Sequence, residues 1–345
     1  MTPEVRRARG PGRVNLIGDH TDYNQGLALP MAIELGVTVA FEPSADAHVA
    51  VTSAAFRPTV RLPVDLPAHG APIAALEPPW ARLIGAMIAT ARPDTGGTMT
   101  IDADLPIGSG LSSSAALCVA VAEVFGVGGS IEAIAGLCQR AEHLAGVPIG
   151  MMDPLICLSG QRGRALLIDF STLDTQHIPI PADAEFVIVD SRQSRALLTS
   201  DYAARVAECD AAAAVIGPLG TADEADLVAL EDPVLRQRAR HVISECRRVR
   251  QCATAFAEGD LTVAGTVMSE SHHSLASDFA VSTVDLDTLV ERLASLPGVY
   301  GARMTGAGFG GCAVALSRPG AVDLHDFSTP AWRVAPSDGT VALRR

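Results

Sequence analysis

Hydrophobic positions along the chain follow two periods, and together they predict a mixture of strands and helices. Short runs of apolar and β-branched residues predict strands at 36–41, 98–103 and 165–170. Longer runs with helical spacing predict helices at 112–125 and 131–144. Because the two kinds of element are interleaved, the pattern favours an α+β fold.

The second half of the chain repeats this mixture after a turn-rich stretch at 171–184, which contains two prolines. We expect the boundary between two lobes there, with an N-terminal lobe at 1–178 and a C-terminal lobe at 179–345. A length of 345 residues suits two such units. The elements expected in the second half are strands at 186–189, 301–304 and 312–316, and helices at 201–215, 235–257 and 286–296.

Composition indicates a globular protein with a large core, since 48% of the residues are hydrophobic. The sequence contains no uncharged apolar run of about 18 residues and no apolar stretch after its first arginines, so we expect neither a membrane span nor a signal peptide. The seven cysteines match neither a C-x-x-C metal site nor a small disulfide framework. Reduced thiols in a cytoplasmic protein are the expectation.

Charge excludes several classes of partner and mechanism. The net charge is −13 and the arginines are interleaved with acids, which argues against nucleic-acid binding. The sequence has no lysine, so all 26 basic residues are arginine. That excludes a P-loop lysine, a protein-kinase lysine and a Schiff-base lysine. Phosphate chemistry in this chain has to use backbone amides, arginine and metal.

The first segment that carries chemistry is Gly12–Asn24, a dense polar run between apolar ones. Asp19, His20 and Asp22 fall on one turn and could together bind the vicinal hydroxyls of a sugar, which need donors and acceptors in fixed positions. The structural alternative is a capped turn, in which the two carboxylates bind backbone amides and the histidine is only exposed.

The second segment is Leu105–Ala116, where a glycine turn feeds directly into an apolar helix. Glycines allow close approach of the backbone to a ligand, and serines at a helix start leave amides directed at an anion. Serine hydroxyls there can also reach Mg²⁺. The segment is a candidate phosphate loop; the alternative is a plain N-capped helix after a tight turn.

The third segment is Gly306–Gly311, which formally fits the dinucleotide pattern G-x-G-x-x-G. That pattern requires a helix afterwards, but residues 312–316 read as a strand, so the Rossmann context fails. Two interpretations remain: a strand-to-strand glycine turn, or a loop that presses on the substrate or on the phosphate loop of the other lobe.

In this order and at these separations, the three segments resemble the three motifs of the GHMP kinase superfamily, and the first is similar to the galactokinase signature. The resemblance runs from about Arg9 to Ala342. It implies an N-terminal lobe with a left-handed β-α-β unit, a ferredoxin-like C-terminal lobe and an active site in the cleft between them. Further agreeing stretches are 150–153, the Tyr202 segment, 238–241, 270–272, 297–300 and 336–339.

The resemblance also implies a function, the ATP-dependent phosphorylation of the anomeric C1 hydroxyl of galactose or a similar sugar. It assigns catalysis to Asp153 and Arg13, and the arginine should keep the aspartate ionised. The implied sugar-binding residues are Asp19, His20, Asp22, Gly150 and Tyr202. Those implied for ATP are Gly108, Gly110, Leu111, Ser112, Ser113 and Ser114, and those for Mg²⁺ are Ser113 and Glu142.

Structural readings stay open for some of these residues when each is taken alone. Glu142 could be an exposed helix charge, Tyr202 a packing side chain and Asp153 a helix N-cap before a proline. The neighbouring His272 and His273 point about 100° apart on a helix, so we interpret them as structural.

The chain departs from the galactokinase pattern at a few positions. Asp19 stands where most galactokinases have a glutamate that reaches the C6 hydroxyl, and it is shorter by about 1.5 Å. The segment between Glu142 and Asp153 is one residue shorter than usual, Pro154 replaces a polar residue, and Leu83, after Trp80, falls where an aromatic residue often contacts adenine.

These departures keep two other functions open. One is a related kinase for galacturonate, N-acetylgalactosamine or arabinose, and the other is a non-catalytic sensor that binds sugar and ATP. The intact phosphate loop and Asp153 favour the kinase. Family habit predicts a monomer.

Overall fold

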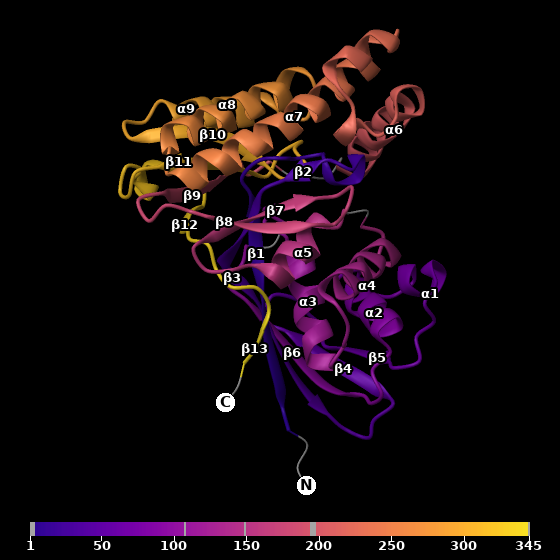
Figure 1. The fold of residues 1–345 in the computed structure, drawn as a ribbon. Coiled ribbons are helices and arrows are strands. Elements are labelled where there is room, and N and C mark those ends of the chain that lie inside the picture. The colour runs from indigo at the N-terminus through magenta and orange to yellow at the C-terminus, as the bar shows by residue number, and fades with distance from the viewer. Residues whose placement is uncertain (1–3, 107, 148–149, 194–197, 344–345) are drawn as a thin grey trace.

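A computed structural model describes residues 4–106, 108–147, 150–193 and 198–343. Figure 1 shows two lobes, with the N-terminal one in indigo to magenta and the helices of the C-terminal one in orange. Each lobe combines a largely antiparallel sheet with helices packed on it. The α+β prediction is confirmed.

The N-terminal lobe is built on a six-stranded sheet whose axis is the pair β1 and β3. Its strand order is β13-β1-β3-β6-β4-β5, and all neighbours are antiparallel except β4 and β6. The strands are β1 (Arg6–Asn15), β3 (Pro30–Pro43), β4 (His48–Ser53), β5 (Val60–Pro63), β6 (Gly97–Ala103) and β13 (Val341–Ala342).

The parallel pair β4 and β6 makes this lobe a β-α-β arrangement, because the chain between them crosses through β5 and two helices. The helices of the lobe are α1 (Gly70–Ala74), α2 (Ala81–Ala91), α3 (Ser113–Phe125), α4 (Ile131–Leu144) and α5 (Met152–Ser159). Helix α3 packs directly on β1, where a Cβ added at Gly10 would lie 2.0 Å from the carbonyl oxygen of Ala116. Small residues on both elements therefore bring the start of α3 close to β1.

A three-stranded sheet lies between the two lobes in the order β2-β7-β8. Its strands are β2 (Leu27–Ala28), β7 (Arg164–Asp169) and β8 (Thr175–Pro179). The prediction of turns throughout 171–184 was wrong at β8, where pairing with β7 makes a strand of a polar, proline-flanked stretch. The boundary expected between residues 178 and 179 falls within this strand.

The C-terminal lobe has a four-stranded antiparallel sheet in the order β10-β11-β9-β12. Its strands are β9 (Glu185–Asp190), β10 (Val299–Thr305), β11 (Cys312–Ser317) and β12 (Ala331–Val334). Its helices are α6 (Leu198–Ile216), α7 (Pro233–Glu258), α8 (Leu261–Ser277) and α9 (Val284–Ala294), with short 3-10 turns at Leu219–Thr221, Glu224–Ala229 and Leu324–Asp326. Another 3-10 turn, Asp22–Asn24, follows β1. Helix α7 begins at Pro233 after the N-cap Asp232 and ends at Glu258, before the C-cap Gly259.

After β12 the chain returns to the N-terminal lobe, as the yellow segment in Figure 1 shows. We call residues 335–343 the return strap. Its backbone N–H groups donate to Ala32 O from Ser337 and to Cys157 O from Thr340, and β13 pairs with β1. The return strap therefore binds both the central sheet and helix α5.

The other helices and strands expected from the sequence are present, with ends that shift by a few residues. Strand β1 was not predicted, because its sequence RRARGPGRVN is polar and contains glycine and proline. Pairing with β3 along ten residues overrides that weak propensity. Within the described residues, no helix combines the length and apolar character needed to cross a membrane.

Candidate active site

The centre of the site is a two-pronged ion pair between Arg13 on β1 and Asp153 in the first turn of α5. Arg13 Nε lies 2.7 Å from Asp153 Oδ1, and its NH2 lies 2.8 Å from Oδ2. Arg13 NH1 also donates to Gly110 O at 2.6 Å. Both side chains are nearly buried, at 7% and 14% exposure. A bidentate pair of this kind fixes the carboxylate in orientation as well as position.

The phosphate-loop candidate enters α3 with a left-handed backbone. Gly108, Gly110 and Ser112 have φ values of 78°, 87° and 61°, and the last is unusual for a residue with a side chain. Ser112 stands at the N-cap position but does not cap the helix; its hydroxyl donates to Asp153 Oδ2 instead. The plain N-cap interpretation therefore fails for Ser112, and a strained backbone lies beside the central carboxylate.

Glu142 on α4 is an internal carboxyl group, not the exposed helix charge that its sequence position allowed. Its side chain is buried, and neither oxygen has a hydrogen bond of normal geometry to any described residue. Burial raises its pKa to about 8, although the Ser114 hydroxyl lies close enough to oppose that shift. The charges of Asp153 and Arg13 also influence it. Ser114 is thus the serine that faces Glu142, whereas the sequence pointed to Ser113.

Next to these serines lies an apolar cavity of about 260 Å³. Phe56 and Trp80 stack on one side of it, with ring centroids 5.8 Å apart and planes at 16°. Ser113, Ser114 and Leu83 also line it. The Trp80 indole N–H is buried without a hydrogen-bond partner in the described part of the chain. A flat aromatic group fits this cavity, with the serines at the end where an attached phosphate would lie.

The sequence singled out Trp80 and Leu83 only through the resemblance and missed Phe56. Phe56 lies in the loop between β4 and β5, and its exposure of 37% is high for a phenylalanine. An aromatic residue in a proline-containing loop was the available signal. Its stacking partner is 24 positions away in the sequence, so the cavity depends on the tertiary fold.

His20 in the turn after β1 is buried, contrary to the structural alternative that left it exposed. His20 Nδ1 lies 3.0 Å from the Tyr23 hydroxyl, and its Nε2 lies 3.2 Å from Ala307 O. Burial lowers the pKa of His20 to about 3, with a further contribution from His241. The ring is therefore neutral; since a carbonyl can only accept, Nε2 carries the hydrogen and Nδ1 accepts from the tyrosine.

The remaining predicted sugar residues lie around this histidine. The Tyr202 ring on α6 lies 5.7 Å from the His20 ring. Asp22 is pressed against Gly150, where a Cβ would lie 1.6 Å from Asp22 Oδ2. Burial raises the pKa of Asp22 to about 6, and the nearby charge of Asp153 adds to that effect. The group predicted from the sequence therefore comes together beside the central ion pair.

Asp19 differs from its neighbours because it turns toward the C-terminal lobe. Its Oδ2 lies 2.5 Å from Arg303 NH2, and its Oδ1 accepts from Gly306 N at 3.0 Å. Burial raises its pKa, against the opposing charge of Arg303. The sequence reading did not single out Arg303, whose strand position gave no sign of a buried charge.

The glycine-rich third segment joins β10 to β11, so the strand-to-strand prediction is confirmed. The loop also contacts the first segment, since Gly306 N and Ala307 O bind the turn at Asp19 and His20. Directly after the loop, Cys312 Sγ on β11 lies 3.1 Å from Ser109 O of the second segment. The three segments meet at the junction of the lobes.

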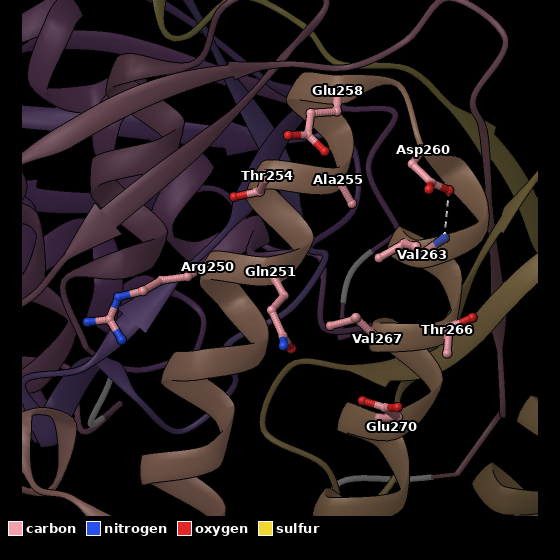
Figure 2. Close-up of a pocket in the computed structure, with 10 residues that line it drawn as sticks. All are labelled: Arg250, Gln251, Thr254, Ala255, Glu258, Asp260, Val263, Thr266, Val267 and Glu270. Carbon is pink, nitrogen blue, oxygen red and sulfur yellow. Dashed lines mark hydrogen bonds between the residues drawn. The ribbon is translucent and has the colours of Figure 1, made fainter.

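A second hollow lies away from this site, in the groove between α7 and α8 (Figure 2). It measures about 570 Å³ and is lined by polar side chains such as Gln251, Thr266 and Glu270. None of the residues predicted for catalysis or binding lines it.

Comparisons with known proteins agree with this geometry. The galactokinase galactose-binding signature matches residues 2–43, and the N-terminal and C-terminal domains of GHMP kinases match residues 81–161 and 252–324. The solved mevalonate kinase of Methanococcus jannaschii shares the fold, with a TM-score of 0.65 and 19% identity over 97% of this chain and 99% of that one. Fold and site together define a GHMP kinase.

The relatives of higher identity are more specific. Galactokinase from Bos taurus is 43% identical over a matched region that covers 89% of this chain and 82% of that protein. A Mycobacterium tuberculosis galactokinase is 41% identical over 89% of this chain and 87% of its own length. The crystal structure of Lactococcus lactis galactokinase with galactose superposes with a TM-score of 0.90 at 30% identity, over 99% of this chain and 96% of that one. The chain belongs to the galactokinase family.

Proposed function

We propose that this protein transfers the γ-phosphoryl group of ATP to the anomeric hydroxyl of galactose, giving galactose 1-phosphate and ADP. The observation that carries the proposal is the Arg13–Asp153 pair, which stands between a sugar-binding turn on one side and a phosphate loop on the other. The 41–43% identity to galactokinases over about nine-tenths of the chain favours galactose over the other sugars.

On the sugar side, the neutral His20, Asp22 and Tyr202 supply donors and acceptors for hydroxyl groups. Asp153 orients the anomeric hydroxyl, and its carboxylate takes the proton as the hydroxyl oxygen bonds to phosphorus and the bond to ADP breaks. A loose transition state asks little of a base, so the orientation imposed by Arg13 is a large part of this contribution. Arg13 also offsets the negative charge that gathers on the transferring group.

On the nucleotide side, the apolar cavity beside Trp80 and Phe56 takes the adenine. The phosphates lie over Gly108–Ser114, where the glycines allow close approach to backbone amides. Leu111, which the resemblance assigns to ATP, is buried within this loop, and its carbonyl oxygen accepts from Arg13 N at 3.1 Å.

The residues present also fit Mg²⁺. Glu142 has a buried carboxyl group with unmet hydrogen-bonding capacity among the described residues, and Ser114 lies beside it. The described residues contain no cluster of three or more metal-binding side chains, which suits an ion held mainly by nucleotide phosphates. When bound, Mg²⁺ neutralises charge on the β- and γ-phosphates. We place Glu142 and Ser114 at this ion, with Ser113 directed to the phosphates.

The test is to measure ADP release from ATP and Mg²⁺ with galactose, galacturonate, N-acetylgalactosamine, arabinose and glucose. Turnover restricted to galactose, and lost in Asp153→Asn, is the expected result. The matched control is Asp104→Asn. Asp104 pairs at 2.8 Å with Arg9, which lies on β1 as Arg13 does, but the Asp104 side chain is 57% exposed. Turnover of a different sugar alone would replace the acceptor, and sugar-dependent ATP binding without turnover would make the protein a sensor.

We further propose that the enzyme acts as a monomer in the cytoplasm. The seven cysteines are all buried, which suits a reducing compartment. Light scattering in solution tests the monomer, and a stable dimer would contradict it.

A further inference from the structure

Four charged side chains form a buried cluster behind the sugar-binding turn. Asp19 follows β1, Glu245 and Arg248 lie on α7, and Arg303 lies on β10. None is more than 7% exposed. Two acids face two arginines, so the charges balance within the cluster. The mechanism proposed above assigns no role to the two arginines or to Glu245.

Arg303 is the member that touches the turn directly. Its NH2 lies 2.5 Å from Asp19 Oδ2 and 3.9 Å from Glu245 Oε1, so one guanidinium lies between both acids. Its NH1 lies 3.5 Å from Asn15 O, just before the turn. A fully buried guanidinium is stable only with such partners, and removal of one partner leaves the other charge uncompensated.

Glu245 holds the other end of the same turn. Its Oε1 accepts from Gly18 N at 3.0 Å and from the Ser271 hydroxyl at 2.5 Å. Its Oε2 accepts from Arg248 Nε at 2.8 Å. The C-terminal lobe therefore binds two successive residues of the turn, Gly18 through its backbone N–H and Asp19 through its carboxylate.

We propose that Arg303 is a positioning residue for sugar recognition, which acts through Asp19 to fix the orientation of the turn that carries His20 and Asp22. Glu245 supplies the second attachment point and the compensating charge. The inference rests on the proposed function, because the turn is the sugar-binding element of that proposal. A binding turn held by charged groups from the opposite lobe is organised before the sugar arrives, which lowers the entropic cost of binding.

Arg248 provides an internal control. It belongs to the same buried cluster and pairs with Glu245 at 2.7 Å, but none of the contacts described for it reaches Asp19. The next positions on α7, Arg250 and Gln251, already line the open groove between α7 and α8 (Figure 2). Loss of either buried arginine removes a charge from the same cluster, while only Arg303 contacts the turn.

The experiment compares Arg303→Met with Arg248→Met. Melting temperature, KM for galactose and KM for ATP are measured for both variants and for the unaltered chain. We expect both variants to melt at lower temperature, and only Arg303→Met to raise the galactose KM, by about tenfold or more, with the ATP KM unchanged. Arg303→Lys should recover part of the galactose affinity. Equal effects of the two variants on the galactose KM would overturn the inference.

If a single arginine variant does not fold, Asp19→Asn, alone and combined with Arg303→Met, tests whether Arg303 acts through Asp19. The double variant removes a complete ion pair and leaves Glu245 with Arg248, so no buried charge is stranded. If Arg303 acts through Asp19, the two Asn variants have the same galactose KM. A further rise in the double variant would contradict that route.

Failure of the proposed function is separate and visible beforehand. If the unaltered chain does not phosphorylate galactose, the proposed function is wrong, whereas normal turnover with equal arginine variants rejects only the role of Arg303.

Discussion

The sugar side and the nucleotide side of the site are prepared in opposite ways. On the sugar side, the buried His20 and Asp19 already have partners: His20 binds Tyr23 and Ala307, and Asp19 pairs with Arg303 and accepts from Gly306. On the nucleotide side, Glu142 and the Trp80 indole N–H are buried without partners among the residues described. The sugar-binding turn is therefore held by protein contacts before its ligand binds, whereas these two groups on the nucleotide side have polar capacity that a ligand can satisfy.

This difference reflects how the two substrates are recognised. Sugars differ from one another in the placement of single hydroxyls, so their discrimination needs donors and acceptors that cannot relax. ATP offers a large planar base and a strong charge, which a cavity and a metal-assisted loop can bind with fewer fixed contacts. Substitutions at four positions test this difference between the two sides.

The largest effect is expected at Asp153, where the halves meet. Asp153→Asn keeps the shape of the side chain but removes the charge that pairs with Arg13 and accepts the proton. We expect kcat to fall by about 10²- to 10⁴-fold, with the KM values for both substrates changed little. Steady-state kinetics on both substrates provide the measurement. Loss of sugar binding rather than turnover would show that Asp153 belongs to the sugar side alone.

Glu142→Gln tests whether the unpartnered carboxyl group serves Mg²⁺. We expect the Mg²⁺ concentration for half-maximal activity to rise by at least about tenfold. In the absence of ligand, by contrast, we expect the substitution to increase stability relative to the wild type as the pH rises. The folded pKa is raised from 4.5 to about 8, so the folded wild-type form retains a proton that the unfolded chain releases. Its stability therefore falls relative to Glu142→Gln as pH rises through that window.

The measurement is the melting temperature of both ligand-free proteins between about pH 5 and pH 9. Parallel curves would mean that Glu142 is not strained by burial, and the contrast between the two sides would lose its main support.

Trp80→Ala addresses the cavity and should have a smaller effect. Removal of the indole abolishes the stack with Phe56, so we expect the ATP KM to rise by about 10-fold, in line with 1–3 kcal/mol for aromatic stacking. The galactose KM should remain unchanged. The variant Trp80→Phe keeps the stack and loses only the N–H group, which separates packing from hydrogen bonding. A galactose KM that rises equally would show that the two sides are not independent.

The smallest expected effect is the acid sensitivity of the sugar side. Burial lowers the pKa of His241 from 6.5 to about 4, and this ring binds Asp19 O and Ser274. Below pH 6.5 His241 binds a proton in the unfolded chain, whereas in the folded protein it stays neutral until about pH 4. The contribution of the neutral His241 to stability is therefore lost as pH falls through that window. His241→Gln should flatten this part of the pH–stability curve by up to one proton.

The control for that measurement, which uses melting temperatures without ligand, is His48→Gln, at a histidine whose side chain is 43% exposed. A curve for His241→Gln that keeps the wild-type slope would place the lost protons elsewhere.

The sequence pointed to the residues at the centre of the site but not to the charges behind them. Arg13 and Asp153 were found through the resemblance to the family motifs, and the turn at His20 was found because its segment puts several polar groups in a short run between apolar ones. Arg303 and Glu245 were not, since a charged residue in a strand or in the run Glu245–Arg250 resembles a solvated one. Only the tertiary fold shows that these charges are buried and face each other.

The same limit explains the fold. Helices such as α3 and α4 follow from local periodicity, whereas β1 and β8 exist because long-range pairing overrides a polar or proline-flanked sequence. The cavity beside Phe56 and Trp80 likewise forms from segments that only the folded lobe brings together.

The return strap has a consequence for biogenesis. Cys157 O on α5 accepts from both the backbone N–H and the hydroxyl of Thr340, and α5 carries Asp153. During synthesis, residues 1–160 leave the ribosome long before residue 340 does. Helix α5, which carries the proposed catalytic carboxylate, is therefore completed only by a piece of chain made some 180 positions later, and β1 has an open edge in the interval. Nascent chains that stop short of the return strap would contain every predicted site residue and still hold α5 loosely, which makes them a natural target for chaperones and proteases.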